Sequence, residues 1–135
     1  MAKQKVYSPN QVLAASFLGG PMAMVYVLWR NFQTMQNPLG MRQILAWGSL
    51  FIAVLMLFAP LMTTSWPDYV LPFAYSFAAW WLAQTYQMPK PAIAASELYE
   101  FQSVGNVIAV SIVFLLAMMA TAIVLYSTMA AVGLI

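Results

Sequence analysis

Two glutamates, Glu97 and Glu100, are the only acidic residues in this chain close enough in sequence to act as a pair. At a spacing of three positions they would share one face of a helix. Paired carboxylates can perform general acid–base catalysis when a pocket shifts the pKa of one of them. Their segment has the character of a solvated or headgroup-level surface, so we interpret the pair as a solvated face.

Other reactive groups are scarce. The 135 residues include no cysteine and no histidine, which excludes disulfides, iron–sulfur clusters, His-ligated haem and metal sites of the Cys or His type. No nucleophile is placed beside a base, and no glycine-rich loop has phosphate-binding spacing. The sequence therefore predicts no catalytic residue, no metal and no cofactor, and we expect the protein not to be an enzyme.

The composition favours lipid over water. Hydrophobic residues make up 64% of the chain and charged residues only 6%, whereas a soluble domain carries about 25% charged residues. The net charge of +2 comes from scattered basic residues, which argues against nucleic-acid binding. The lipid bilayer is the predicted environment.

Four apolar segments predict an all-α integral membrane protein that forms a single domain over 1–135, because a bilayer core needs roughly 20 helical residues. The expected spans are 12–29, 44–62, 69–86 and 107–128.

A shorter element is expected before the last span. Ile93, Leu98 and Phe101 fall on one face at helical spacing, which predicts a short interfacial amphipathic helix over 91–104. This apolar face is a candidate partner or interface surface. The alternative is a linker turn that leads directly into the last span.

The first apolar segment is interrupted by Gly19, Gly20 and Pro21, so it is either kinked or re-entrant. A full span would place Lys3 and Lys5 opposite the other basic residues, against the positive-inside rule. A re-entrant hairpin avoids this, but its turn must be covered by protein or water. We favour the kinked full span, in which the glycines let a neighbouring helix approach closely.

Basic residues predict the orientation. Arg30, Arg42 and Lys90 lie in or beside the connections 30–43 and 87–104, which are therefore expected on the cytoplasmic side of the cell inner membrane. The loop 63–68 and the C-terminus are expected on the opposite side.

Polar groups within the spans are few and uncharged. Asn106, near the start of the last span, is the candidate intramembrane polar contact between helices. The serine and threonine hydroxyls are expected to bond to backbone or to a neighbouring helix.

Three short motifs carry a resemblance to a family. The chain reads Tyr-Ser-Pro-Asn-Gln at 7–11, Gly-Gly-Pro at 19–21 and Arg-Asn-Phe at 30–32. This pattern resembles an uncharacterised family of small bacterial multi-span inner-membrane proteins. The resemblance implies a bacterial inner-membrane setting and no assigned activity.

The function expected from these observations is that of a non-catalytic accessory or structural subunit of a larger membrane protein complex. Its partners would be other membrane protein subunits or copies of itself. The alternative is a small homo-oligomeric channel or transporter, whose pore could be lined by serine or asparagine side chains.

Overall fold

The computed structural model describes residues 2–62 and 65–135. The described chain is mostly helical, and the loop predicted over 63–68 lies partly outside it. In chain order the elements are β1 (Gln4–Val6), α1 (Pro9–Thr34), α2 (Pro38–Phe58), a 3-10 turn η1 (Ala59–Leu61), α3 (Val70–Tyr86), α4 (Lys90–Ala95), β2 (Tyr99–Phe101) and α5 (Val104–Ala131).

The long helices begin at polar caps. The backbone N–H of Gln11 donates to Ser8 Oγ at 3.2 Å, and the backbone N–H of Ser8 donates to Gln11 Oε1 at 3.0 Å. This reciprocal pair satisfies two N–H groups that a helix start leaves unpaired. Ser103 caps α5 through the N–H of Asn106. These caps fix where α1 and α5 start.

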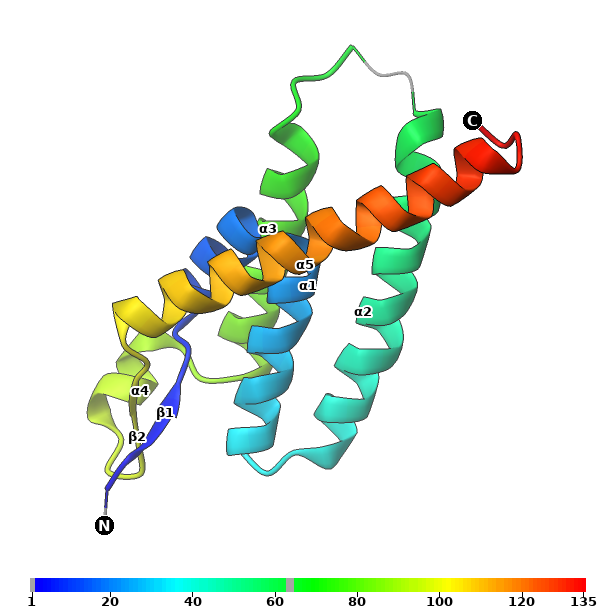
Figure 1. The fold of residues 1–135 in the computed structure, drawn as a ribbon. Coiled ribbons are helices and arrows are strands. Elements are labelled where there is room, and N and C mark those ends of the chain that lie inside the picture. The colour runs from blue at the N-terminus through cyan, green and yellow to red at the C-terminus, as the bar shows by residue number, and fades with distance from the viewer. Residues whose placement is uncertain (1, 63–64) are drawn as a thin grey trace.

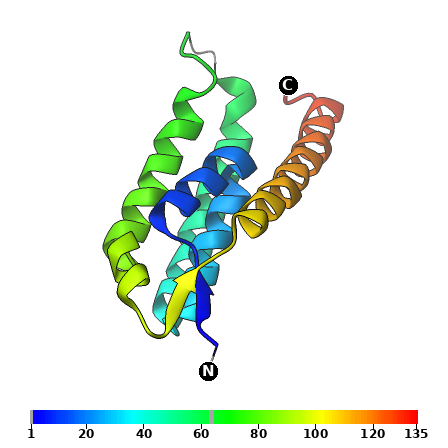
Figure 2. The ribbon, with the colours of Figure 1, turned by 90° about the vertical axis from the view of Figure 1, so that its left-hand side faces the viewer.

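α1 does not run as one rod. Gly20 has φ 81° and ψ −172°, a backbone conformation that glycine adopts without steric cost. The backbone N–H of Tyr7 donates to Asn31 Oδ1 at 2.8 Å, although the two residues are 24 positions apart. A straight helix would separate them by about 36 Å. The two halves of α1 therefore fold back at Gly20, as the dark-blue and light-blue segments in Figure 2 show.

The second half of α1 lies at the centre of the bundle. α2 and α3 pack beside it, and α5 crosses it diagonally (Figure 1). Within the most apolar 18-residue stretch of α1, 56% is buried, compared with 11% in the corresponding stretches of Pro38–Leu61 and α5. α1 is thus the inner helix, and the other two long helices present most of their apolar surface outward.

Three helices in the described part of the chain are long and apolar enough to cross a membrane: Pro9–Thr34, Pro38–Leu61 and Val104–Ala131. This supports the prediction of a helical membrane protein. The third predicted segment is also a helix, α3, but its 17 residues rise only about 26 Å, slightly less than the hydrocarbon core.

The segment before α5 differs from the prediction. A helix forms only over Lys90–Ala95, and Tyr99–Phe101 is a strand that pairs in parallel with β1. The helix expected over 91–104 is therefore wrong beyond Ala95, and Glu97 and Glu100 do not share a helix face. The N-terminal segment supplies the backbone partner that favours a strand here, with Gln4 N donating to Leu98 O at 2.9 Å.

Candidate functional site

A buried polar junction holds the N-terminal segment against α1 and α3. The Asn31 amide accepts from Tyr7 N at 2.8 Å and donates to Tyr7 O at 2.8 Å and to Gln87 Oε1 at 2.8 Å. The Gln87 amide in turn donates to Leu28 O at 2.9 Å. Asn31 is 2% exposed and Gln87 is 8% exposed. One side chain of α1 therefore connects three segments that are distant in sequence.

The junction continues to α5 through Tyr7. Its hydroxyl donates to Asn106 Oδ1. Burial raises the pKa of Tyr7 to about 12, and Tyr26 adds a smaller upward contribution. The phenol is consequently protonated at neutral pH and available as a donor. Asn106, the predicted polar contact, thus lies at this junction and bonds to the segment before α1.

The chemistry of the junction is structural. Its side chains are two asparagines, a glutamine and a phenol, and each finds a hydrogen-bond partner among the others or in the backbone. Neutral amides do not act as nucleophiles or as bases near pH 7. We conclude that the junction positions the N-terminal segment. The sequence did not single out Asn31 and Gln87, because each is a polar residue at the end of an apolar helix and its burial appears only in the folded chain.

The glycine site lies where α1 and α5 touch. A Cβ atom added to Gly19 would be 2.9 Å from Ser111 Cα, so the two backbones approach too closely for a larger residue. Gly20 forms the turn itself, with Met118 of α5 nearby. Pro21 is buried and follows the turn. The three predicted residues lie together at the top of the folded-back helix, under α5.

The residues expected on one interface face differ in burial and in secondary structure, although α4 and β2 contact each other. Ile93 is 2% exposed and belongs to the core, whereas Leu98 is 70% exposed. Phe101 is in β2 rather than in a helix. Glu97 and Glu100 are exposed, and neither has a pocket around it that would support acid–base chemistry.

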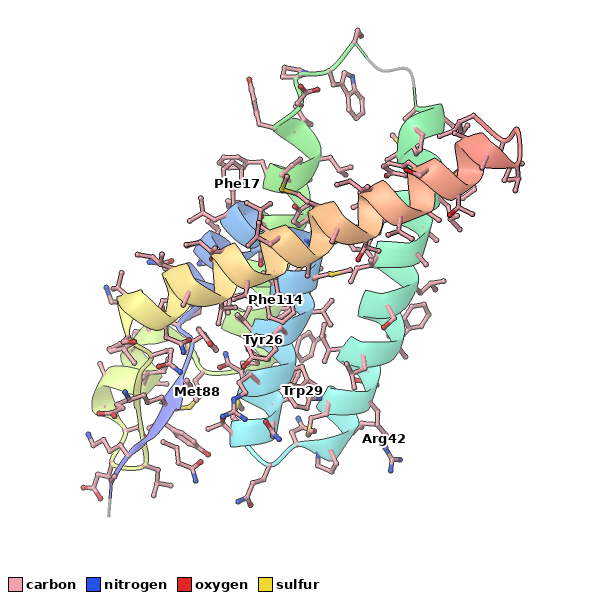
Figure 3. All side chains as sticks on the ribbon, viewed as in Figure 1. Phe17, Tyr26, Trp29, Arg42, Met88 and Phe114 are labelled. Carbon is pink, nitrogen blue, oxygen red and sulfur yellow. The ribbon has the colours of Figure 1, made fainter. Side chains whose placement is uncertain are left out.

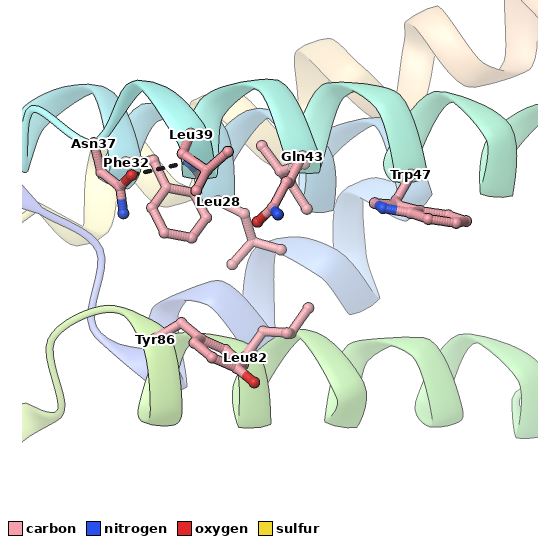
Figure 4. Close-up of a pocket in the computed structure, with 10 residues that line it drawn as sticks. Leu28, Phe32, Asn37, Leu39, Gln43, Trp47, Leu82 and Tyr86 are labelled. Atoms are coloured by element: carbon pink, nitrogen blue, oxygen red, sulfur yellow. Dashed lines mark hydrogen bonds between the residues drawn. The ribbon is translucent and has the colours of Figure 1, made fainter.

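An apolar groove of about 570 Å³ lies between α2 and α3, with α1 as its floor (Figure 4). Its volume is within the range of small-molecule sites. Leu28 and Leu82 line the interior, while Gln43, Trp47 and Tyr86 supply polar atoms at its margins. The groove has room for an apolar chain, and its polar groups are too few to define one ligand.

A second hollow, which we call the basic pocket, lies beside the end of α1. Its volume is about 420 Å³. β1, the end of α1 and the residue after β2 provide its lining, which consists of Gln4, Lys5, Arg30, Gln33, Thr34, Gln36 and Gln102. It contains two cations and no carboxylate, so an anion is the complementary ligand.

Metal binding finds no support in residues 2–62 and 65–135, where no group of three or more His, Cys, Asp or Glu side chains could hold a metal ion.

The chain matches no known protein family, no curated protein and no solved structure.

Proposed function

We propose that the protein is a membrane-embedded, non-catalytic subunit of a larger membrane assembly, and that the outer half of α5 is the surface on which a partner helix packs. The observation that carries this proposal is the way α5 leaves the bundle. Its first half contacts α1 at Ser111, while most residues after Met118 are exposed.

In the proposed topology, α2, α3 and α5 cross the bilayer and α1 enters and returns. The hydrogen bonds between Tyr7 and Asn31 support the return. α5 covers the turn at Gly20, as backbone at membrane depth requires. This proposal adopts the re-entrant alternative in place of the full span that the sequence favoured.

Charge gives the proposed orientation. All five basic residues lie in four places: Lys3 and Lys5 at β1, Arg30 near the end of α1, Arg42 near the start of α2, and Lys90 at the start of α4. All four places lie at the lower end of Figure 1, whereas the C-terminus lies at the upper end. By the positive-inside rule, we place the lower end in the cytoplasm and the protein in a bacterial inner membrane.

The exposed half of α5 has the side chains of a helix-packing face. A shallow hollow of about 530 Å³, here called the α5 hollow, is lined by Ala120, Thr121, Val124, Leu125 and Thr128. Thr121 and Thr128 donate to carbonyls of their own helix at 2.8 Å. Small residues let the backbone of another helix approach closely in lipid, where packing drives association.

The internal hydrogen bonds argue against a polar pore. Ser16 and Ser111 donate to the carbonyls of Val12 and Val107, four positions back in their own helices, as the two threonines of α5 do. Because the donors of these hydroxyls are already paired, they offer a water-filled path only acceptor oxygens. A homo-oligomeric channel is therefore the competing proposal, and the following experiment is designed to detect it.

The test compares two substitutions of exposed alanines in α5. Ala120→Leu fills the α5 hollow, and Ala109→Leu makes the same change on the first half of the helix. We expect the protein purified from native membranes to carry a stoichiometric foreign membrane protein. A120L should lose this partner and A109L should retain it. A symmetric homo-oligomer that conducts ions in liposomes, or equal partner retention by both variants, would overturn the proposal.

A further inference from the structure

We propose that the basic pocket binds the phosphate group of an anionic phospholipid, whose acyl chains lie on the aromatic face of α1 above it. This inference rests on the membrane placement proposed above, and it is independent of any protein partner. The shared ligand chemistry is a phosphate anion. A free phosphate would need only the pocket, whereas a lipid also needs an adjoining apolar surface.

The cations are brought together by the fold. Lys5 belongs to β1 and Arg30 to the second half of α1, and they are adjacent to one hollow only because α1 folds back and the N-terminal segment returns beside it. The paired hydrogen bonds between Tyr7 and Asn31 hold that arrangement. On a straight first helix the two cations would be too far apart to bind one phosphate.

The pocket is equipped for phosphate recognition. Arg30 donates through Nη1 to Gln33 Oε1, which orients its guanidinium while leaving other donors available. Arginine presents several N–H groups in a planar fork that matches phosphate oxygens. Side chains of Gln4 and Gln36 add neutral amide donors at the margin. The lining therefore combines charge with directional hydrogen bonding.

An aromatic surface continues from the pocket along the same helix face. Tyr26 lies three and four positions before Trp29 and Arg30, and Gln33 lies four and three positions after them, so the four residues lie on one side of α1. The Tyr26 ring is 4.9 Å from Phe114 of α5 and 6.4 Å from Trp29. Figure 3 shows these rings together beneath α5.

This order matches the order of groups in a phospholipid at a membrane surface. Arg30 lies four residues before the end of α1, about 6 Å along the axis. Tyrosine and tryptophan favour the level between headgroups and acyl chains. The change from aromatic to cationic side chains along one face therefore places the phosphate at the basic end and the acyl chains toward the membrane interior.

One acidic group opposes binding. Glu100 is the partner of Lys5 in the register of the two strands and is exposed. Side chains paired across strands point to the same face, where opposite charges attract. Glu100 thus offsets part of the charge of Lys5, and its removal should strengthen anion binding.

The test measures lipid binding to the full chain in detergent by native mass spectrometry. Phosphatidylglycerol is the anionic probe and phosphatidylcholine the zwitterionic control. The variant Lys5→Gln/Arg30→Gln removes both pocket cations. Arg42→Gln/Lys90→Gln removes two basic residues from the same end outside the pocket; Arg42 points away from the bundle in Figure 3. We expect about tenfold weaker phosphatidylglycerol binding in the first variant and less than about a twofold change in the second.

Four further measurements sharpen the result. Glu100→Gln should strengthen phosphatidylglycerol binding, and Arg30→Lys should weaken it because the planar fork is lost. Equal losses in the two double variants would overturn the proposal in favour of diffuse charge attraction. Displacement of phosphatidylglycerol by inorganic phosphate at millimolar concentration would assign the pocket to a free anion and overturn the lipid. A thermal unfolding curve of the first double variant that matches the unsubstituted protein shows that the fold is intact.

Discussion

The basic end of the molecule and the outer half of α5 use their polar side chains in opposite ways. At the basic end, Asn31 and Gln87 bond to segments that are distant in sequence. In the outer half of α5, Thr121 and Thr128 bond only to carbonyls four residues back in their own helix. The first arrangement builds tertiary structure, and the second hides polar atoms on a surface that faces outward.

This difference indicates that the two regions have different roles. The junction fixes the folded-back α1 and the N-terminal segment, so substitutions there should alter stability. Apart from the buried Met129, the outer half of α5 contributes little to the bundle, so substitutions at its exposed positions should alter association instead.

Asn31→Leu should be the most damaging substitution. It leaves the backbone N–H and C=O of Tyr7 and the Gln87 amide buried without their partner, at an expected total cost of about 4 kcal/mol. Denaturant unfolding in detergent measures this loss. Asn10→Leu is the matched control, because Asn10 accepts one exposed bond from Trp80 and should cost less than about 1 kcal/mol. Similar losses in the two variants would contradict the role of the junction.

Gly19→Ala should separate α1 from α5. The added Cβ would lie 2.9 Å from Ser111 Cα and 2.5 Å from the Cβ of Ala23 in α1 itself, and such overpacking costs about 2 kcal/mol. Gly105→Ala is the control within α5, since nothing lies within 4 Å of its added Cβ; this change should leave stability unchanged or raise it by up to about 1 kcal/mol. A neutral Gly19→Ala would show that the two helices do not pack as closely as described.

Tyr7→Phe should lower the free energy of unfolding by about 1 kcal/mol, because the bond to Asn106 is lost. The pKa of Tyr7 is raised from 10.0 to about 12 in the folded protein. The stability that depends on its proton is therefore fully present below pH 10 and is lost as the pH rises toward 12. Unfolding measured across this range should show a shallower decline in Tyr7→Phe. Identical slopes would mean that Tyr7 is not buried.

Thr128→Val should have the smallest effect, within about 0.5 kcal/mol of the unsubstituted protein. The hydroxyl bonds only to Val124 O in the same helix, and the side chain is exposed. The measurement is the same unfolding titration. A loss comparable to that of Gly19→Ala would mean that the outer half of α5 belongs to the folded core, which would remove the contrast between the two regions.

Hydrophobic patterning predicted the helical membrane class and the approximate positions of the long helices, because apolar length is a local property of the sequence. It did not predict the strand at Tyr99–Phe101, whose pairing partner Gln4–Val6 is almost a hundred positions away. The predicted interfacial helix extended too far because the local spacing of apolar residues carries no information about a backbone partner that is distant in sequence.

The sequence predicted only part of the candidate site. Asn106 stood out as a polar residue near the start of an apolar run, and Gly-Gly-Pro stood out as an interruption. Asn31 and Gln87 did not, because each looks like an ordinary polar residue at a helix end. The basic pocket could not be predicted at all, since Lys5 and Arg30 come together only after α1 has folded back.

Single cysteines test most directly whether the first helix returns to the side of the membrane from which it entered, since the chain contains no native cysteine. Lys5→Cys, Arg42→Cys and Asp68→Cys are each probed in intact cells with a membrane-impermeant thiol reagent. The account predicts that Asp68→Cys is labelled from outside, whereas Lys5→Cys and Arg42→Cys are both labelled only after the membrane is opened. Labelling of Lys5→Cys from outside, together with Asp68→Cys, would show that the first helix crosses the membrane and would contradict the account.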